Sequence, residues 1–273
     1  MHDSPQDIPP IDPEHRADGS DGENHPFQPN KADPWGPQRY GESFADVYDE
    51  WYDDVSDAEA TADFVDNFGQ NQRILELGIG TGRLALPLLE RGHSVVGVDA
   101  SMSMLERFDD PVGSVAVGAD MAQLPTRDTH FDTVLVATNT LFNLSNEQRQ
   151  RDCIAEAHRA LRRGGRLIIE AMVPGDRDPS LDRLVTTRSL GVDHAVLTAT
   201  IRDHDRQEIT GQHIEISESG IRLRPWKVHY LTIDELDMIA VDTQFRLGDR
   251  WADWDKTPLT NDSPNAVSVY VAI

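Results

Sequence analysis

Three alternating glycines, placed between an apolar run and a helical pattern, constrain the fold of this chain more than any other feature. The run covers residues 74–77, and the glycines are Gly78, Gly80 and Gly82. Glycines at this spacing allow a tight turn and let a ligand approach the main chain, and a helix that follows offers free N–H groups. Such strand–loop–helix units occur in parallel sheets, which bind ligands at the carboxyl ends of their strands.

Strand and helix patterns alternate between about residues 72 and 172. Short apolar runs at 74–77, 94–98, 114–117, 131–137 and 166–172 predict five buried strands. Helical patterns lie between them: Gly92 closes one helix, Ser101 can cap the next, and the capping box at 145–148 opens a third that stops at Gly164 and Gly165. We therefore expect an α/β fold with a doubly wound, mostly parallel, seven-stranded Rossmann-like sheet.

The segment after the fifth predicted strand has a different pattern. Residues 184–230 alternate apolar and polar side chains between polar turns, which predicts an antiparallel β insertion of three or four strands. A second capping box, at 232–235, opens a helix that runs to about residue 241, and residues 266–273 predict a last strand. The expected organisation is a tail at 1–39 and one domain at 40–273, with the insertion at 184–230 packed over one end.

An acid, Asp99, ends the second predicted strand, seventeen residues after Gly82. A carboxylate there can accept hydrogen bonds from both hydroxyls of a ribose, so the loop and the acid imply an adenosine-containing ligand. A dinucleotide fingerprint, G-x-G-x-x-G, needs its third glycine at position 83. This chain has Arg83 there, which speaks against a nicotinamide cofactor but leaves that alternative open.

An acid also precedes the loop, at Glu76, and gives it the form E-x-G-x-G-x-G. This form resembles the first motif of the class I S-adenosylmethionine-dependent methyltransferases of the small-molecule type. The resemblance extends over most of 40–273, including the turn at 161–165, which is similar to the family's L-x-P-G-G with Arg163 in place of the proline. It implies transfer of a methyl group from S-adenosyl-L-methionine to an N or O atom of a small-molecule acceptor, with the insertion on the acceptor side.

The resemblance also assigns cofactor contacts. Asp99 matches the family's ribose-binding acid, and residues 118–121 resemble its third motif, in which an acid faces the adenine amino group and the next side chain packs near the ring. Residues 137–139 match the segment beside the methionine part of the cofactor. The complete implied set is Tyr48, Glu76, Gly78, Gly80, Thr81, Gly82, Asp99, Ala100, Met104, Asp120, Met121, Ala137 and Asn139.

An aromatic stripe begins the predicted domain. Apolar residues at 44, 47, 48, 51, 52 and 55 recur every three or four positions, which predicts one amphipathic helix from Tyr40. The segment resembles the tyrosine-bearing helix that folds over the cofactor in small-molecule methyltransferases. Tyr48 is the first candidate for a cofactor contact, with Tyr40 and Tyr52 behind it, and core packing explains each of them equally well.

No motif fixes a catalytic base. His229, Tyr230 and His194 lie in or beside the predicted insertion and are the candidates, although a structural or exposed position explains each of them more simply. No paired carboxylates stand at the strand ends, so we expect no metal. The single cysteine, Cys153, excludes an intramolecular disulfide and fits a small buried residue.

The net charge is −23 over 273 residues, with 25 Lys and Arg against 48 Asp and Glu. A field this negative argues against nucleic-acid partners and anionic membranes, and no apolar run approaches the ~18–20 residues of a spanning helix. Residues 1–60 hold 16 acids and three bases, and half of the 16 prolines precede residue 40. We therefore expect residues 1–39 to be a disordered acidic tail. The start of the chain lacks a secretory signal pattern, so we expect a cytoplasmic protein; its oligomeric state stays open.

Two alternatives to the methyltransferase remain at this stage. The first is a nicotinamide-dependent oxidoreductase with a variant glycine loop, which the strand order permits. The second is a non-catalytic protein that keeps the nucleotide-binding fold and works through its acidic tail.

Overall fold

The computed structural model describes Trp35 and residues 37–52, 57–108, 114–175 and 178–273. Most of the predicted tail lies outside these ranges. Its last three residues belong to helix α1 (Pro37–Phe44), so the ordered part of the chain begins before residue 40.

A seven-stranded sheet forms the centre of the molecule, as predicted. Across the sheet the strands follow the order β10-β11-β5-β4-β1-β2-β3, and within it only the pairings of β11 with β10 and with β5 are antiparallel. The direction of strand order reverses between β1 and β4, which places a crevice at their carboxyl ends. The strands are β1 (Arg73–Leu77), β2 (Ser94–Asp99), β3 (Ser114–Gly118), β4 (Phe131–Val136), β5 (Leu161–Met172), β10 (Phe245–Trp251) and β11 (Asn265–Ala272).

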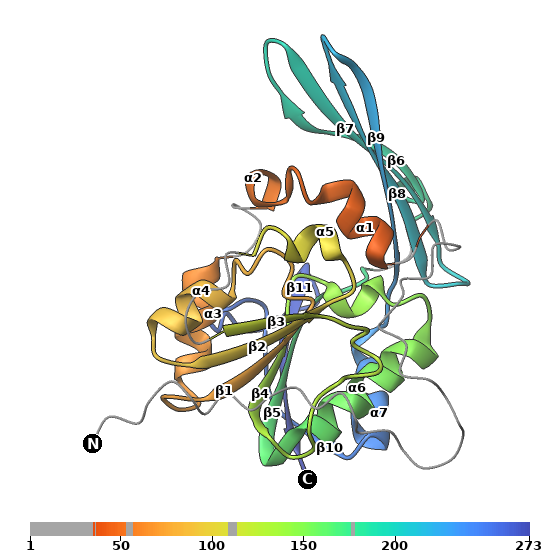
Figure 1. Cartoon of the computed structure of the whole chain (residues 1–273). Coiled ribbons are helices and arrows are strands. Elements are labelled where there is room, and N and C mark those ends of the chain that lie inside the picture. Colours follow the sequence, from red (N-terminus) through yellow and green to blue (C-terminus); the bar gives the residue numbers. More distant parts are fainter. Residues whose placement is uncertain (1–34, 36, 53–56, 109–113, 176–177) are drawn as a thin grey trace, which may run out of the picture.

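Helices cover both faces of this sheet (Figure 1). Helices α3 (Ala58–Asp66) and α4 (Ala85–Glu90) pack on one face, and α6 (Glu147–Ala160) and α7 (Ile233–Asp242) pack on the other. Strand β1 is buried on both sides, because Ile74 points toward α3 and α4 while Leu75 and Leu77 join the cluster of α6 and α7. This three-layer arrangement explains why the parallel strands are continuously apolar in sequence.

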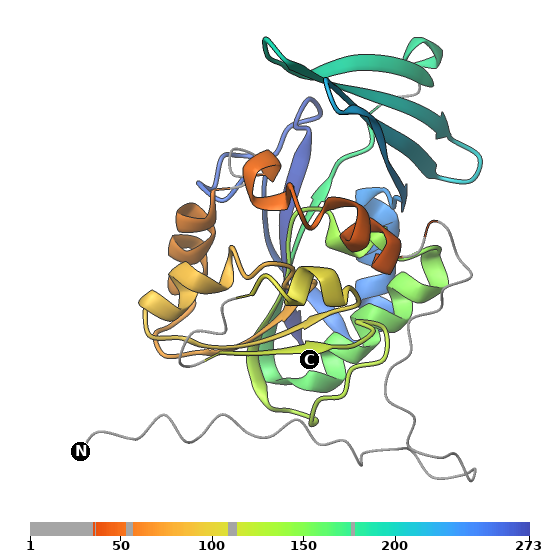
Figure 2. The same cartoon turned by 45° about the horizontal axis from the view of Figure 1, so that its top comes forward.

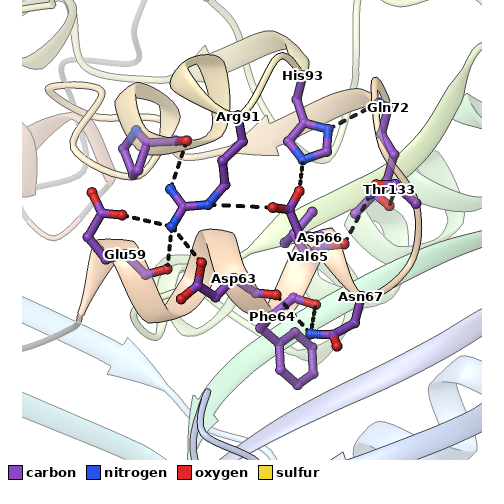
Figure 3. A network of polar contacts seen from close by, with 12 residues as sticks. Glu59, Asp63, Phe64, Val65, Asp66, Asn67, Gln72, Arg91, His93 and Thr133 are labelled. Atoms are coloured by element: carbon purple, nitrogen blue, oxygen red, sulfur yellow. Dashed lines mark hydrogen bonds and ion pairs between the residues drawn. The ribbon is translucent and has the colours of Figure 1, made fainter.

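A buried polar network fastens α3 to the sheet (Figure 3). The His93 ring accepts a hydrogen bond from the Gln72 N–H at 3.0 Å and contacts the Asp66 carboxylate at 2.8 Å, so its Nε2 carries the proton. The Gln72 amide donates to the Val65 carbonyl of α3 and to the Gly69 carbonyl of the loop, and it accepts from the Thr133 hydroxyl at 2.7 Å. These bonds hold the turn that leads into β1 and hence the start of the glycine loop.

The insertion forms its own four-stranded antiparallel sheet, which confirms that prediction. Its strands are β6 (Arg183–Leu190), β7 (His194–Asp203), β8 (Glu208–Ser217) and β9 (Gly220–His229), in the order β6-β7-β8-β9. Figures 1 and 2 show this sheet extending away from the central sheet on the side where helices α1 and α2 (Tyr48–Tyr52) lie.

The prediction of one continuous N-terminal helix was wrong. The segment breaks after Phe44 into α1 and α2, and Val55 lies outside the described residues. The Arg224 guanidinium of β9 takes the Ser43 carbonyl, which a continuing helix would pair with the Val47 N–H. The Val47 N–H bonds to the Phe44 carbonyl instead, at 2.9 Å, so the helix ends in a turn.

Several element ends also differ from prediction. Asn146, not Ser145, caps α6, because its side chain accepts from the Arg149 N–H. Helix α6 ends at Ala160, and the Gly164-Gly165 turn is an irregular stretch of β5, where the register with β4 shifts. Helix α5 (Met102–Leu105) is a single turn capped by Ser101, as predicted, and η2 (Thr140–Asn143) and η3 (Pro179–Leu181) are 3-10 turns. Helix α3 and strand β10 were not predicted.

Candidate cofactor site

A cavity lies at the carboxyl ends of β1, β2 and β4, at the reversal of strand order. The space between its walls, with its open mouth included, is about 670 Å³. Its lining comes from five parts of the chain: Tyr40, Gly41, Tyr48, Gly78, Gly80, Val98, Asp99, Ala100, Met104, Ala119, Asp120, Met121, Thr138, Thr140, Asn143 and Leu144.

The glycine loop forms the floor of the cavity. Gly78, Gly80 and Gly82 have φ of 76°, 57° and 86°, a region that side chains disfavour. A Cβ on Gly78 would lie 2.4 Å from Thr140, and one on Gly82 would lie 2.1 Å from Phe108. A Cβ on Gly80 would meet nothing closer than 4.0 Å, so the outer two glycines allow packing and the middle one leaves open space.

Asp99 is held at the edge of the loop by main-chain groups. Its carboxylate accepts from the Gly80 N–H at 2.9 Å and from the Ser101 N–H at 2.8 Å. Burial raises the pKa of Asp99, and these hydrogen bonds oppose that rise. A carboxylate offers about four acceptor positions, so these main-chain bonds leave capacity for a hydroxyl of a ribose.

Asp120 and Met121 line the same cavity beyond β3. One Asp120 oxygen accepts from the Ala122 N–H at 2.9 Å, and the other contacts the Arg149 guanidinium of α6. The carboxylate is therefore fixed in orientation before any ligand arrives. Met104 of α5 borders the cavity from the side of the N-terminal helices.

Glu76 lies inside β1 and is 3% exposed. Burial raises the pKa of Glu76 to about 8, while nearby Arg83 lowers it and Asp99 raises it. Its Oε2 has no hydrogen-bond partner among the described residues. A buried acid with an unused oxygen fits a site that receives a cationic or donor group from a ligand.

The N-terminal helices close the cavity from above. Tyr40, Gly41 and Tyr48 line it, and a Cβ on Gly41 would lie 2.2 Å from Ser101, so α1 sits directly on the start of α5. The Tyr40 hydroxyl donates to that of Tyr52 at 3.1 Å, and the Tyr48 and Tyr52 rings stack at 4.7 Å. Burial raises the pKa of Tyr40 and Tyr48, so both hydroxyls stay protonated.

Five of the predicted cofactor residues do not line the cavity: Glu76, inside β1, and Thr81, Gly82, Ala137 and Asn139. The Thr81 hydroxyl donates to Asp49, and Gly82 packs against Phe108. The Asn139 side chain accepts a hydrogen bond from the Met172 N–H at 2.5 Å. Ala137 is buried where the loop after β4 begins. The segment after β4 instead contributes Thr138, followed by Thr140 and Asn143 of η2 and by Leu144, the residue after η2. Sequence reasoning missed these four, since the motif indicated the loop but not which side chains turn inward.

None of the three catalytic candidates lines the cavity. Tyr230 is 4% exposed in the core, and His194 is exposed on the outer part of the insertion. His229 ends β9, with its pKa lowered by burial and with an Nδ1 that has no partner in the part of the chain that is described. Among the described residues, no three His, Cys, Asp or Glu side chains are grouped to hold a metal ion, and no helix is long and apolar enough to cross a membrane.

Comparison with known proteins decides the family. Residues 75–169 match the model of a family described as "Methyltransferase domain". The solved structure of the CcbJ methyltransferase from Streptomyces caelestis is 33% identical, has a TM-score of 0.82, and aligns over 88% of this chain and 100% of that one. The chain belongs to the class I S-adenosylmethionine-dependent methyltransferases. A cypemycin N-terminal methyltransferase from Streptomyces is 31% identical over 174 residues, 61% of this chain and 69% of the relative.

S-adenosylmethionine is therefore the cofactor of this methyltransferase, and neither the oxidoreductase nor the non-catalytic alternative is supported. The sugar N-methyltransferase KedS8 from Streptoalloteichus shares the fold at a TM-score of 0.63 and 17% identity, over 94% of this chain and 99% of that one. The methyltransferase spans 64% of an uncharacterized protein from Methanocaldococcus jannaschii and 57% of an uncharacterized methyltransferase from Anoxybacillus flavithermus, each 32% identical.

Proposed function

We propose that the protein transfers a methyl group from S-adenosylmethionine to a nitrogen atom of a small-molecule acceptor, with oxygen as the alternative atom. One observation carries the proposal: Asp99, held by the Gly80 N–H at 2.9 Å, lines the cavity together with Asp120. The bound cofactor supplies an activated methyl group. The protein then needs to orient it, exclude water and position the acceptor.

The chain's own groups divide these tasks. Asp99 accepts from the ribose hydroxyls, Asp120 accepts from the adenine amino group, and Met121 packs beside the ring. Glu76, with its unused Oε2, receives the ammonium group of the methionine part. Tyr48 covers the cavity and keeps water out of it. The remaining predicted contacts, Thr81, Gly82, Ala137 and Asn139, act by shaping the loops that carry these groups.

The lining of the cavity favours an amine acceptor. Among its described lining residues there is no histidine or lysine, and its two acids are used by the cofactor. A hydroxyl acceptor needs a base to become a good nucleophile, whereas an amine can shed its proton to solvent before it binds. Methyltransferases named for N-terminal and sugar-nitrogen acceptors among the similar proteins support the same choice. If the acceptor needs a base, His229 is the first candidate, ahead of Tyr230 and His194, because burial lowers the pKa of its ring and keeps the ring neutral.

We also propose that residues 40–273, together with 37–39 at the start of α1, form the catalytic unit and that 184–230 faces the acceptor. The rest of the predicted tail, residues 1–36, is not needed for catalysis. We propose a cytoplasmic protein without nucleic-acid or membrane partners; the net charge of −23 supports the absence of those partners.

A release assay tests the acceptor class. The full-length protein, S-adenosylmethionine and matched panels of primary amines, secondary amines and alcohols are followed by S-adenosylhomocysteine formation. Turnover by amines that rises with pH near the amine pKa supports the proposal. Turnover confined to alcohols, and lost in His229→Gln, would transfer the assignment to oxygen with His229 as base.

A further inference from the structure

The segment that closes the cavity is held at its far side by a buried cation. We call residues 37–52, which contain α1 and α2, the closing segment. Its Tyr40, Gly41 and Tyr48 form one wall of the cavity, so the position of this segment sets how far a bound ligand is covered. Its contacts with the rest of the chain therefore set how readily the cofactor exchanges.

Arg224 of β9 connects the closing segment to the insertion sheet. Its side chain is 1% exposed, although guanidinium groups are rarely buried. One nitrogen donates to Asp46 Oδ1 at 2.6 Å and to the Ser43 carbonyl, and another donates to Glu215 Oε2 at 2.8 Å. Ser43 lies in the last turn of α1, Asp46 lies in the turn between α1 and α2, and Glu215 belongs to β8. The Arg224 guanidinium thus joins the closing segment to the insertion sheet.

The surroundings of this bridge are apolar and aromatic. The guanidinium carbon lies 5.2 Å from the centre of the Trp51 ring, and the His213 ring lies 5.4 Å from Phe44 and 5.7 Å from Trp51. Burial lowers the pKa of His213 to about 4, so His213 is neutral at pH 7 and adds no competing charge. Removing the Asp46 charge leaves the buried Arg224 guanidinium with one carboxylate, Glu215, in place of two, and loss of such a contact acts mainly on the rate of opening.

We propose that Arg224 is a positioning residue that holds the closing segment over the cofactor through Asp46, so that opening of this ion pair governs cofactor release. The proposal rests on the proposed function of the cavity. It predicts that weakening the pair speeds dissociation of S-adenosylhomocysteine and leaves its association almost unchanged.

The test replaces the partner on the closing segment, because truncating Arg224 would remove the cation from two acids at once, Asp46 and Glu215, and risks misfolding. Asp46→Asn removes the charge, Asp46→Glu keeps it, and Glu215→Gln weakens the bridge from the sheet side. Arg222→Ala is the matched control, because Arg222 also pairs with Asp46, at 2.5 Å, but its side chain is 54% exposed and such pairs contribute little. Dissociation is followed by stopped-flow tryptophan fluorescence, with excess S-adenosylmethionine as competitor and with thermal melts in parallel.

We expect Asp46→Asn to raise the dissociation rate on the order of tenfold, Glu215→Gln to raise it about threefold, and Arg222→Ala to change it less than twofold. Asp46→Glu should stay within about threefold of the unsubstituted protein. If Asp46→Asn and Glu215→Gln both bind the ligand and release it within twofold of the unsubstituted rate, Arg224 is only structural and the proposal is wrong. Failure of the unsubstituted protein to bind the ligand would instead refute the proposed function.

Discussion

The Thr81 hydroxyl donates a hydrogen bond to the Asp49 carboxylate at 2.5 Å. Thr81 belongs to the glycine loop and Asp49 belongs to α2, so this bond joins the floor of the cavity to its cover. Together with the bridge at Arg224, it holds the closing segment at both of its sides. Residues far from the reacting atoms therefore contribute to cofactor affinity through the position of this segment.

Thr81→Val tests this bond, since valine keeps the shape of the side chain and removes the donor. We expect the affinity for S-adenosylhomocysteine to fall about threefold to tenfold, because one charge-assisted hydrogen bond contributes roughly 1–2 kcal/mol. Titration calorimetry measures the change, and Asp49→Asn, which still offers an oxygen acceptor, is the control. Equal affinities in Thr81→Val and the unsubstituted protein would show that the bond does not hold the segment.

Gly80→Ala separates the cofactor cavity from backbone strain. The added methyl group meets no protein atom within 4.0 Å and so occupies open space at the cavity floor. We expect the protein to fold, with a stability loss of roughly 1–2 kcal/mol from the positive φ, and to bind S-adenosylhomocysteine at least tenfold more weakly. Gly92 has a similarly positive φ of 85° but lies away from the cavity, so Gly92→Ala should lose stability without losing affinity for the ligand. Equal binding by the two variants would contradict the placement of the cofactor over Gly80.

Glu76 predicts a pH dependence with a defined sign. The folded, ligand-free protein holds the Glu76 proton up to about pH 8, whereas the unfolded chain releases it near 4.5. Stability therefore falls as pH rises through this window and no further above it. Glu76→Gln should remove this fall in thermal melts.

The same proton opposes binding of a cationic ligand group. Affinity for S-adenosylhomocysteine should rise with pH up to about 8, by at most about tenfold per pH unit. In Glu76→Gln the affinity should be weaker and flatter with pH. Identical pH profiles for the two proteins would exclude Glu76 from the cofactor site.

Gln72→Ala should weaken the fold without touching the cofactor. Its buried amide bonds to the Val65 and Gly69 carbonyls and to the Thr133 hydroxyl, and an alanine side chain can form none of these bonds. We expect a loss of about 2–4 kcal/mol in denaturant unfolding, with ligand affinity unchanged within twofold. Thr133→Val, which removes only one bond, should lose less, and a larger loss there would contradict this network.

The local motifs of this chain were predictable because each depends on neighbouring residues. The glycine loop, the acid that ends β2 and the Ser101 cap all follow from residue types at short spacing. The alternating pattern of 184–230 likewise predicted an antiparallel sheet of three or four strands, and the structure has four, from Arg183 to His229.

Long-range contacts determined what the sequence did not reveal. The break between α1 and α2 depends on Arg224, 181 residues beyond Ser43, and no local signal marks it. Strand β10 carries polar, exposed side chains at the sheet edge, so its pattern lacks the apolar run of the inner strands. Thr138 lines the cavity, while the side chain of its neighbour Asn139 bonds to β5. Both residues have positive φ, and this main-chain geometry determines which of the two side chains faces the cavity.

Titration calorimetry with S-adenosylhomocysteine tests the central claim most directly. We predict one binding site per chain, and at least thirtyfold weaker binding in Asp99→Ala, which loses charge-assisted bonding to the ribose. Absence of binding by the folded protein, or equal binding by Asp99→Ala, would contradict the account of this cavity.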